Sequence, residues 1–184
     1  MSLENCFSDM RTFTVCTIIV FCCLVIGCGI GGHYVQSTGS MLPNIGTGDH
    51  LGTVEIKSNS LNPIERFDIV VYQAQATKHK VDFDIKNTVF IHRVIGMPKE
   101  KFEIKEGKVS INDKLLDETF QKINGGEDFP AVIIPENEYL LLGDNRPQSL
   151  DSRYWNKPTI KREDIRGKVT TIIHKEDYDK GKRW

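Results

Sequence analysis

The chain has 184 residues, which allows one domain with a small insertion, and its formal net charge is -1 at pH 7. Only three charged residues, Glu4, Asp9 and Arg11, precede residue 33, so the rest of the chain is neutral. Because nucleic-acid binding depends on clustered positive charge, this balance gives no electrostatic case for a nucleic-acid partner.

Cysteine is confined to the first part of the chain. All five cysteines precede residue 33: Cys6, Cys16, Cys22, Cys23 and Cys28. A disulfide framework and a cysteine-based zinc site are therefore excluded for residues 33–184, and we expect no metal or other cofactor there.

Residues 12–32 carry no charge, and the centre of this segment, residues 15–26, is strongly apolar. As a helix it is about 31 Å long, which matches a hydrocarbon core of roughly 30 Å. No face of it is polar, which argues against a helix at the edge of a soluble core. Since Arg11 flanks its N-terminal side, we expect a cytoplasmic N-terminus (residues 1–11), a single-pass transmembrane anchor in the inner (cell) membrane (residues 12–32) and an extracytoplasmic domain (residues 33–184). The lipid bilayer is then a partner of the chain.

Two other interpretations of the apolar segment stay open. A cleaved secretory peptide normally has a basic N-terminal region, whereas this one contains Glu4 and Asp9 beside Arg11. Residues 25–28, Val-Ile-Gly-Cys, resemble a bacterial lipobox, in which the cysteine becomes a lipidated N-terminus.

The chain beyond residue 49 has the pattern of short strands separated by turns. β-branched and alternating runs predict strands at residues 50–56, 67–72, 88–95, 102–104, 109–111, 138–142 and 168–174. Polar or glycine-rich stretches predict loops at residues 73–87 and 121–131, and a short helical turn is expected near residues 161–165. These patterns predict a mostly β fold, an antiparallel β domain, after the apolar segment.

Ser40 lies between Gly39 and a Met-Leu-Pro step. Pro43 fixes its own φ and favours an extended conformation at Leu42, so the peptide is locally stiff. A serine on a stiff loop is suited to act as a nucleophile when a base reaches it, although such serines are also common in ordinary loops. Its target should lie near the membrane surface, because the apolar segment ends only a few residues before it.

His92 is the residue that we expect to supply the base. In a strand it shares a face with Phe90 and Val94, while Arg93 points to the other face. A half-buried histidine bonded to a backbone carbonyl is the simpler interpretation. The alternative makes a neutral imidazole, with a pKa near 6.5, the general base for Ser40.

Residues 143–155 follow a strand and are rich in Asp, Asn, Ser and Arg. Such a run is typical of a solvated loop. It also has the groups needed to pack against a site and orient a base. Asp144 and Asp151 are the carboxylates that we expect to hold a histidine tautomer, as the third member of a catalytic triad does.

Four segments together resemble the conserved boxes of type I signal peptidases, in order and rough spacing. They are Thr38-Gly39-Ser40-Met41-Leu42-Pro43, Arg66-Phe67-Asp68-Ile69-Val70-Val71-Tyr72, His92-Arg93-Val94-Ile95-Gly96-Met97-Pro98 and the bacterial-type GDNRPQSLDSRYW at residues 143–155. The resemblance covers nearly the whole chain. It implies a membrane-anchored serine endopeptidase with an all-β catalytic domain that cuts signal peptides from exported preproteins after small residues.

The resemblance assigns roles residue by residue. Ser40 matches the nucleophile, and its backbone N–H with the Thr38 hydroxyl matches the oxyanion hole. His92 occupies the position of the bacterial general-base lysine, as in the ER-type and archaeal branch, which pairs serine with histidine and aspartate. This implies a Ser40–His92 pair supported by Asp151, with Ser149 close to the base.

Further expectations follow from the same resemblance. The groove for the preprotein is expected at Met41, Phe90 and Ile91. Phe67 replaces a glycine of the family pattern, and Asn44 replaces a frequent threonine. A non-catalytic membrane-bound scaffold and a peptidase dedicated to one conjugation or pilus substrate remain as alternatives. A self-cleaving repressor would need a DNA-binding module where this chain has its apolar segment.

Overall fold

The structure is a computed structural model that describes residues 30–56, 63–73, 88–120 and 122–184. No helix within these ranges has the length and hydropathy of a transmembrane span. Most of the expected anchor and most of the expected loop at residues 73–87 lie outside the described residues. The last three anchor residues, 30–32, belong to the first strand.

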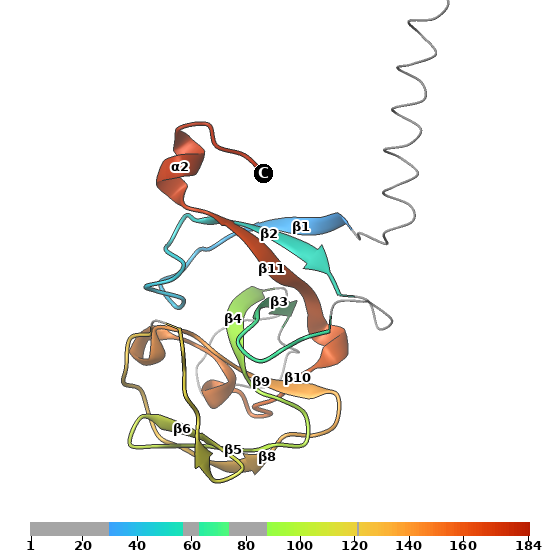
Figure 1. Cartoon of the computed structure of the whole chain (residues 1–184), viewed down its shortest axis with the longest axis vertical. Helices are drawn as coiled ribbons and strands as arrows, with labels where there is room; N and C mark the ends of the chain where they lie inside the picture. Colours follow the sequence, from blue (N-terminus) through green and yellow to red (C-terminus); the bar gives the residue numbers. More distant parts are fainter. Residues whose placement is uncertain (1–29, 57–62, 74–87, 121) are drawn as a thin grey trace, which may run out of the picture. The chain divides into compact units, whose positions relative to one another are not determined.

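The larger sheet has seven strands in the order β1-β2-β11-β3-β4-β9-β10 (Figure 1). Its strands are β1 (Ile30–Val35), β2 (His50–Glu55), β3 (Ile69–Gln73), β4 (Val89–Gly96), β9 (Glu138–Leu142), β10 (Ile160–Lys161) and β11 (Ile165–Ile173). Every pairing whose register is described is antiparallel. The expected antiparallel β domain is therefore confirmed.

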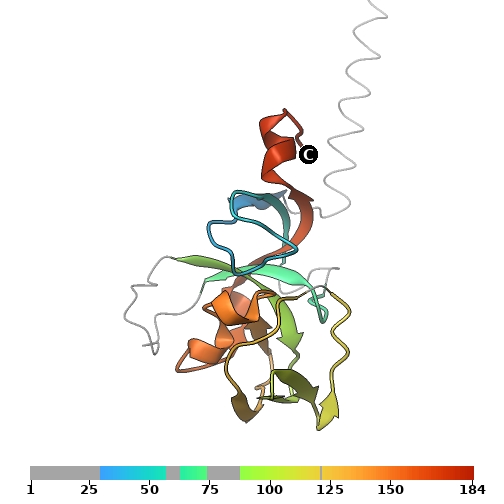
Figure 2. The same cartoon turned by 90° about the vertical axis from the view of Figure 1, so that its left-hand side faces the viewer.

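A smaller sheet contains β7 (Lys114–Leu115), β6 (Lys108–Ile111), β5 (Lys101–Lys105) and β8 (Phe129–Ile133), in that order. Glu106 and Gly107 connect β5 to β6 with φ of 53° and 71°, as a tight hairpin turn requires, which confirms the hairpin expected there. Figures 1 and 2 show this sheet at the end of the domain away from β1 and β2.

Helices are short. They are η2 (Arg146–Gln148), η3 (Ser152–Tyr154), η4 (Arg162–Asp164) and α2 (Lys175–Asp179). The helical turn expected near residues 161–165 corresponds to η4. The 3-10 turns η2 and η3 lie in the polar segment that follows β9 and shape it around the site described below.

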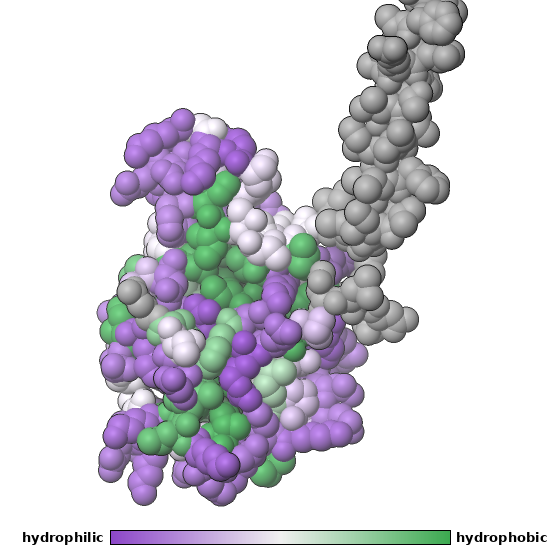
Figure 3. All heavy atoms as spheres, in the orientation of Figure 1, coloured by the Kyte–Doolittle hydropathy of each residue, from purple (hydrophilic) through white to green (hydrophobic). Residues whose placement is uncertain are grey.

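Burial is greatest in the centre of the larger sheet. All five residues of β9 are buried, as are the last six of β4, because elements cover both faces there. Phe102 of β5 packs in one apolar cluster with Leu140 and Leu142 of β9, which joins the two sheets. The face shown in Figure 3 is mostly hydrophilic, with a band of apolar residues running down from below α2.

Two strand predictions need correction. The strand expected at residues 67–72 begins only at Ile69, because Phe67 has a φ of 73°, outside the β region. The loop expected at residues 121–131 already contains the start of β8. Pro130 is tolerated in that strand because β8 is an edge strand, where one backbone N–H is not needed for pairing.

Candidate active site

The loop between β1 and β2 carries Ser40 and is fixed by its apolar side chains. Ile45 donates its backbone N–H to the Met41 carbonyl at 3.0 Å, so the loop makes a helical turn after the serine. Met41 and Ile45 are fully buried in a cluster with residues of β2, β3 and β4. Met41 therefore lies in the core rather than in the groove where we expected it, because the turn that leaves Ser40 at a pocket places the next side chain inward.

Ser40 is only 6% exposed, and polar groups surround its hydroxyl. Ser40 Oγ accepts hydrogen bonds from the Thr38 hydroxyl at 3.1 Å and from Gln36 Nε2 at 3.2 Å. The backbone N–H of Ser40 donates to Thr38 Oγ1 at 3.4 Å. The two groups expected to form an oxyanion hole therefore lie side by side at the serine.

The polar segment after β9 packs directly onto the nucleophile loop. Asn145 donates its backbone N–H to the Ser40 carbonyl at 2.9 Å and its side-chain amide to the Gly39 carbonyl at 3.0 Å. A Cβ atom at Gly143 would lie 2.2 Å from Ser149 Oγ and 2.6 Å from the Ser40 carbonyl oxygen, so only glycine fits there. This segment is therefore a structural part of the site and not a solvated loop.

His92 lies in the middle of β4 and is 1% exposed. Its Nδ1 is 2.9 Å from the Tyr72 hydroxyl, and its Nε2 is 3.2 Å from Ser149 Oγ. Burial lowers the pKa of His92 from 6.5 to about 4, although the carboxylates of Asp151 and Asp144 oppose this shift. The imidazole is therefore neutral at neutral pH, as a general base must be.

Asp151 is fully buried but bonds to neighbours other than His92. Its two oxygens accept hydrogen bonds from Arg153 Nε and Nη2, each at 2.8 Å, and from the Gly143 N–H at 3.0 Å. Burial raises the pKa of Asp151, but the bonds and charge of Arg153 more than offset this and hold it below its ordinary value. Asp151 thus acts on His92 through its charge, without the hydrogen bond of a triad aspartate.

Asp144 is also fully buried and forms an ion pair on the other face of β4. It accepts hydrogen bonds from Arg93 Nε at 2.8 Å and Nη2 at 2.6 Å, and from Asn44 Nδ2 at 2.8 Å. The expectation that Asp144 orients His92 is therefore not met by contact. Its structural role is to tie the nucleophile loop, through Asn44, to the arginine that follows His92.

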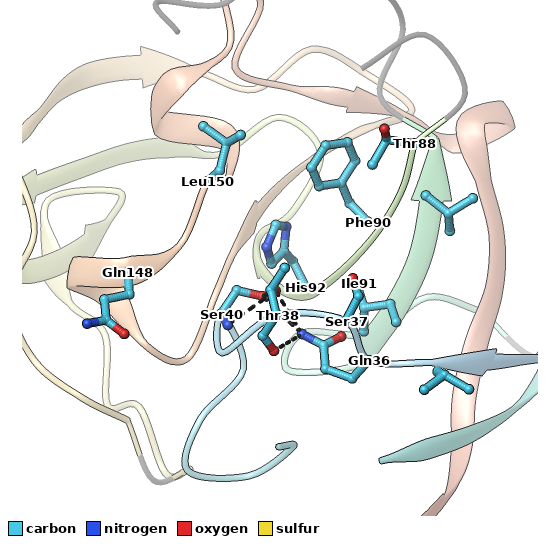
Figure 4. A pocket seen from close by; sticks show the side chains of 12 residues that line it. Gln36, Ser37, Thr38, Ser40, Thr88, Phe90, Ile91, His92, Gln148 and Leu150 are labelled. Atoms are coloured by element: carbon cyan, nitrogen blue, oxygen red, sulfur yellow. Dashed lines mark hydrogen bonds between the residues drawn. The ribbon is translucent and has the colours of Figure 1, made fainter. Parts of the chain in front are cut away.

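One pocket joins these groups (Figure 4). It has a volume of about 240 Å³ and is lined at one end by Thr38, Ser40 and His92. Its remaining walls include apolar side chains: Val35, Phe90, Ile91 and Leu150. Phe90 and Ile91 thus lie where we expected the substrate groove.

The nucleophile and the base share this pocket without a direct hydrogen bond between them. Among the described residues, Ser40 Oγ bonds to Gln36 and Thr38, while the His92 nitrogens bond to Tyr72 and Ser149. Catalytic hydrogen bonds are often long in unliganded enzymes and tighten only when substrate binds. No group of three or more His, Cys, Asp or Glu side chains within the described part of the chain is arranged to hold a metal ion.

Sequence reasoning missed Gln36, Tyr72 and Asn145. A signal existed for two of them: Gln36 is four residues before Ser40, and Asn145 lies inside the segment already singled out. Tyr72 gave no signal of its own, because its contact with His92 depends on how β3 pairs with β4.

Comparison with known proteins identifies a family. A sequence model described as "Signal peptidase, peptidase S26" matches residues 10–174. A probable signal peptidase I-2 of Synechocystis sp. is 36% identical over 138 residues, covering 74% of this chain and 60% of that protein. A signal peptidase I of Leptolyngbya laminosa is 34% identical over 137 residues, covering 74% of this chain and 65% of its own length.

A solved structure is also similar. The signal peptidase I of Enterococcus faecalis shares 27% sequence identity with a TM-score of 0.48, over 60% of this chain and 100% of that one. The chain spans 60 to 65% of the length of the two cyanobacterial relatives. Because the family model covers most of the sequence, the chain belongs to the S26 family of signal peptidases.

Proposed function

We propose that the chain is a signal peptidase I-like serine endopeptidase that cleaves preproteins, with Ser40 as nucleophile and His92 as general base. The observation that carries this proposal is the pocket in which the Ser40 hydroxyl, the Thr38 hydroxyl and a buried neutral imidazole meet. Family membership supports the same reaction class.

The first chemical step is acylation. Ser40 Oγ forms a bond to the carbonyl carbon of the scissile peptide, and its proton passes to Nε2 of His92. The reactive tautomer of His92 therefore carries its own proton on Nδ1. This N–H donates a hydrogen bond to the Tyr72 hydroxyl oxygen, 2.9 Å away. Ser149 Oγ lies 3.2 Å from Nε2 and helps to fix the orientation of the ring.

The charge that develops on the carbonyl oxygen needs hydrogen-bond donors close to the nucleophile. In the resting enzyme the Ser40 N–H and the Thr38 hydroxyl bond within the loop, at 3.4 and 3.1 Å, and both point into the same turn. Substrate redirects them to the oxyanion. One such donor is worth on the order of 10² to 10³ in rate.

Three proton transfers complete the cycle. The peptide C–N bond breaks as His92 returns its proton to the leaving amine, which leaves Ser40 acylated. Water then attacks the ester carbonyl and gives a proton to His92, and that proton passes to Ser40 Oγ as the acyl bond breaks. Water is the only co-substrate that this cycle uses.

The pocket walls favour uncharged side chains on the substrate. A cavity of about 240 Å³ with Phe90, Ile91 and Leu150 in its lining offers no countercharge to an ionic side chain. Cleavage after small residues, which the family resemblance implies, agrees with these walls.

The proposed setting is the surface of the inner membrane. Because residues 30–32 belong to β1, the uncleaved anchor is proposed within residues 12–29, and the domain that begins with β1 lies on the extracytoplasmic side. Protease added to intact spheroplasts is expected to digest the domain while cytosolic markers survive. Full protection of the domain contradicts this topology, and a mature protein that begins at Cys28 with attached lipid establishes the lipoprotein form instead.

Cleavage of a preprotein in detergent tests the reaction. The wild-type protein is expected to cut the preprotein after its signal peptide, and Ser40→Ala to abolish the cut without changing the thermal midpoint by more than a few degrees. Ser110→Ala, in the smaller sheet, is the matched control and should retain the wild-type rate. Substantial cleavage by the Ser40→Ala protein refutes the nucleophile assignment.

A further inference from the structure

Gln36 is a buried polar residue that the reaction above does not use. It follows β1 directly and is 3% exposed. Its backbone N–H donates to the Asp49 carbonyl at 3.0 Å, and its carbonyl accepts from the Gly48 N–H at 2.8 Å, so its backbone is held at both ends. A residue fixed in this way presents its side chain in one direction.

That side chain points to the nucleophile (Figure 4). Gln36 Nε2 lies 2.9 Å from the Thr38 carbonyl oxygen, 3.3 Å from Thr38 Oγ1 and 3.2 Å from Ser40 Oγ. A carbonyl oxygen only accepts hydrogen bonds, so the amide atom that faces it must be the nitrogen. The carboxamide therefore donates to the nucleophile loop.

The donors around Thr38 and Ser40 fix where each hydroxyl proton lies. The Gln36 amide has two N–H groups, so one donates to the Thr38 carbonyl and the other is shared between Thr38 Oγ1 and Ser40 Oγ. Thr38 Oγ1 also accepts from the Ser40 N–H, and its own proton goes to Ser40 Oγ at 3.1 Å. Ser40 Oγ then accepts from both Thr38 and Gln36, which occupies both of its lone pairs. Its proton is left to point away from these donors, toward the rest of the pocket that contains His92.

We infer that Gln36 is a positioning residue for the nucleophile: its carboxamide orients the Ser40 hydroxyl proton toward the base and holds Thr38 in place for the oxyanion. This inference rests on the proposed peptidase function. The amide also stabilises the charge that develops on Ser40 Oγ as the proton leaves, because a hydrogen bond to a charged acceptor is stronger than one to a neutral hydroxyl.

Gln36→Met tests the inference, since methionine has the same length and no donor. We expect kcat for preprotein cleavage to fall about 10- to 100-fold with KM nearly unchanged. Gln73→Met is the matched control and should keep the wild-type kcat, because the Gln73 amide oxygen accepts from Arg166 and has no described bond to the nucleophile loop. A Gln36→Met protein that folds and retains the wild-type kcat overturns the inference and leaves the peptidase assignment standing.

Gln36→Glu gives a second test of the inference, in which the pH dependence of the cleavage rate is measured. Its carboxylate accepts rather than donates, so it faces the Thr38 carbonyl unfavourably until it is protonated. The ratio of its cleavage rate to the wild-type rate is therefore expected to rise as the pH falls from 7 to 5. A ratio that does not change with pH overturns the inference.

Labelling by a fluorophosphonate separates this inference from the proposed substrate. The reagent joins Ser40 Oγ to phosphorus with loss of fluoride, and it needs no preprotein. Slower labelling of Gln36→Met than of wild type supports the inference, even if no preprotein is cut. The absence of preprotein cleavage would refute only the proposed function. Equal labelling rates overturn it.

Discussion

Replacing His92 by asparagine removes a buried imidazole that unfolding would release to water. Burial lowers the pKa of His92 to about 4 in the folded protein, against 6.5 when it is exposed. The unfolded chain therefore binds a proton between pH 6.5 and pH 4 that the folded protein does not. The contribution of His92 to the free energy of unfolding is therefore greatest above pH 6.5 and declines as the pH falls toward 4.

The size of this effect follows from the two pKa values. One pKa unit corresponds to about 1.4 kcal/mol, so the full difference is worth about 3 kcal/mol. Between pH 7 and pH 5 the free energy of unfolding of the wild type should fall by about 2 kcal/mol more than that of His92→Asn. Carboxylates whose lowered pKa values do not involve His92, such as Asp49, contribute equally to both proteins and cancel in the comparison.

Urea denaturation of both proteins at pH 7 and pH 5 measures this difference, and the cleavage assay gives an independent reading. The kcat/KM of the wild type is expected to stay level from pH 8 to about pH 5 and to fall only toward pH 4, whereas His92→Asn should be nearly inactive throughout. An activity that falls with a midpoint near 6.5, or a stability difference that does not depend on pH, would show that the imidazole is solvated and refute the argument.

Three further predictions concern the surroundings of the site. Thr38→Val should lower kcat by on the order of 10² to 10³, while Thr38→Ser restores it; similar rates for valine and serine would remove Thr38 from the oxyanion hole. Asp151→Asn should lower the free energy of unfolding in urea by roughly 3–5 kcal/mol, because Arg153 is left buried without its countercharge; unchanged stability would contradict the ion pair. Phe67→Gly should be more stable than Phe67→Ala by about 1 kcal/mol, since both lose the ring but only alanine keeps the cost of a positive φ, and the opposite order in thermal melts would exclude the left-handed backbone.

The sheet was largely predictable because its strands have strong local patterns. The run of β-branched residues in β3 and β4 and the Glu106-Gly107 turn between β5 and β6 each specify their structure over a few residues. The start of β3 was missed because Phe67 adopts a backbone conformation that glycine prefers. The signal that was available is the glycine that the family pattern has at the position of Phe67.

The sequence pointed to several residues that line the pocket, but it did not predict their hydrogen-bond partners. Ser40, Thr38 and His92 line one pocket, and their catalytic roles stay a prediction. The residue at hydrogen-bond distance from His92 Nδ1 is Tyr72 and not an aspartate. That contact depends on the register in which Val70 faces His92, and a shift by one residue would turn Tyr72 to the other face. No local pattern fixes such a register.

Arg153 competes with His92 for the carboxylate of Asp151, and the sequence analysis did not consider this competition. Arg153 is two residues away on a 3-10 turn, and its guanidinium reaches both carboxylate oxygens. A short-range ion pair of this kind costs little chain entropy to form. It therefore forms at the expense of a longer-range bond to the histidine.

The order of strands in the larger sheet has a consequence for biosynthesis. Ser40 lies between β1 and β2, and His92 lies on β4, yet β2 joins β3 and β4 only across β11, residues Ile165–Ile173. During synthesis, the strand that completes this connection is made after both catalytic residues. Such long-range pairing forms late in folding. The nascent chain is therefore expected to expose its serine before the histidine is in place, and to gain peptidase activity only when nearly all of the domain has been made.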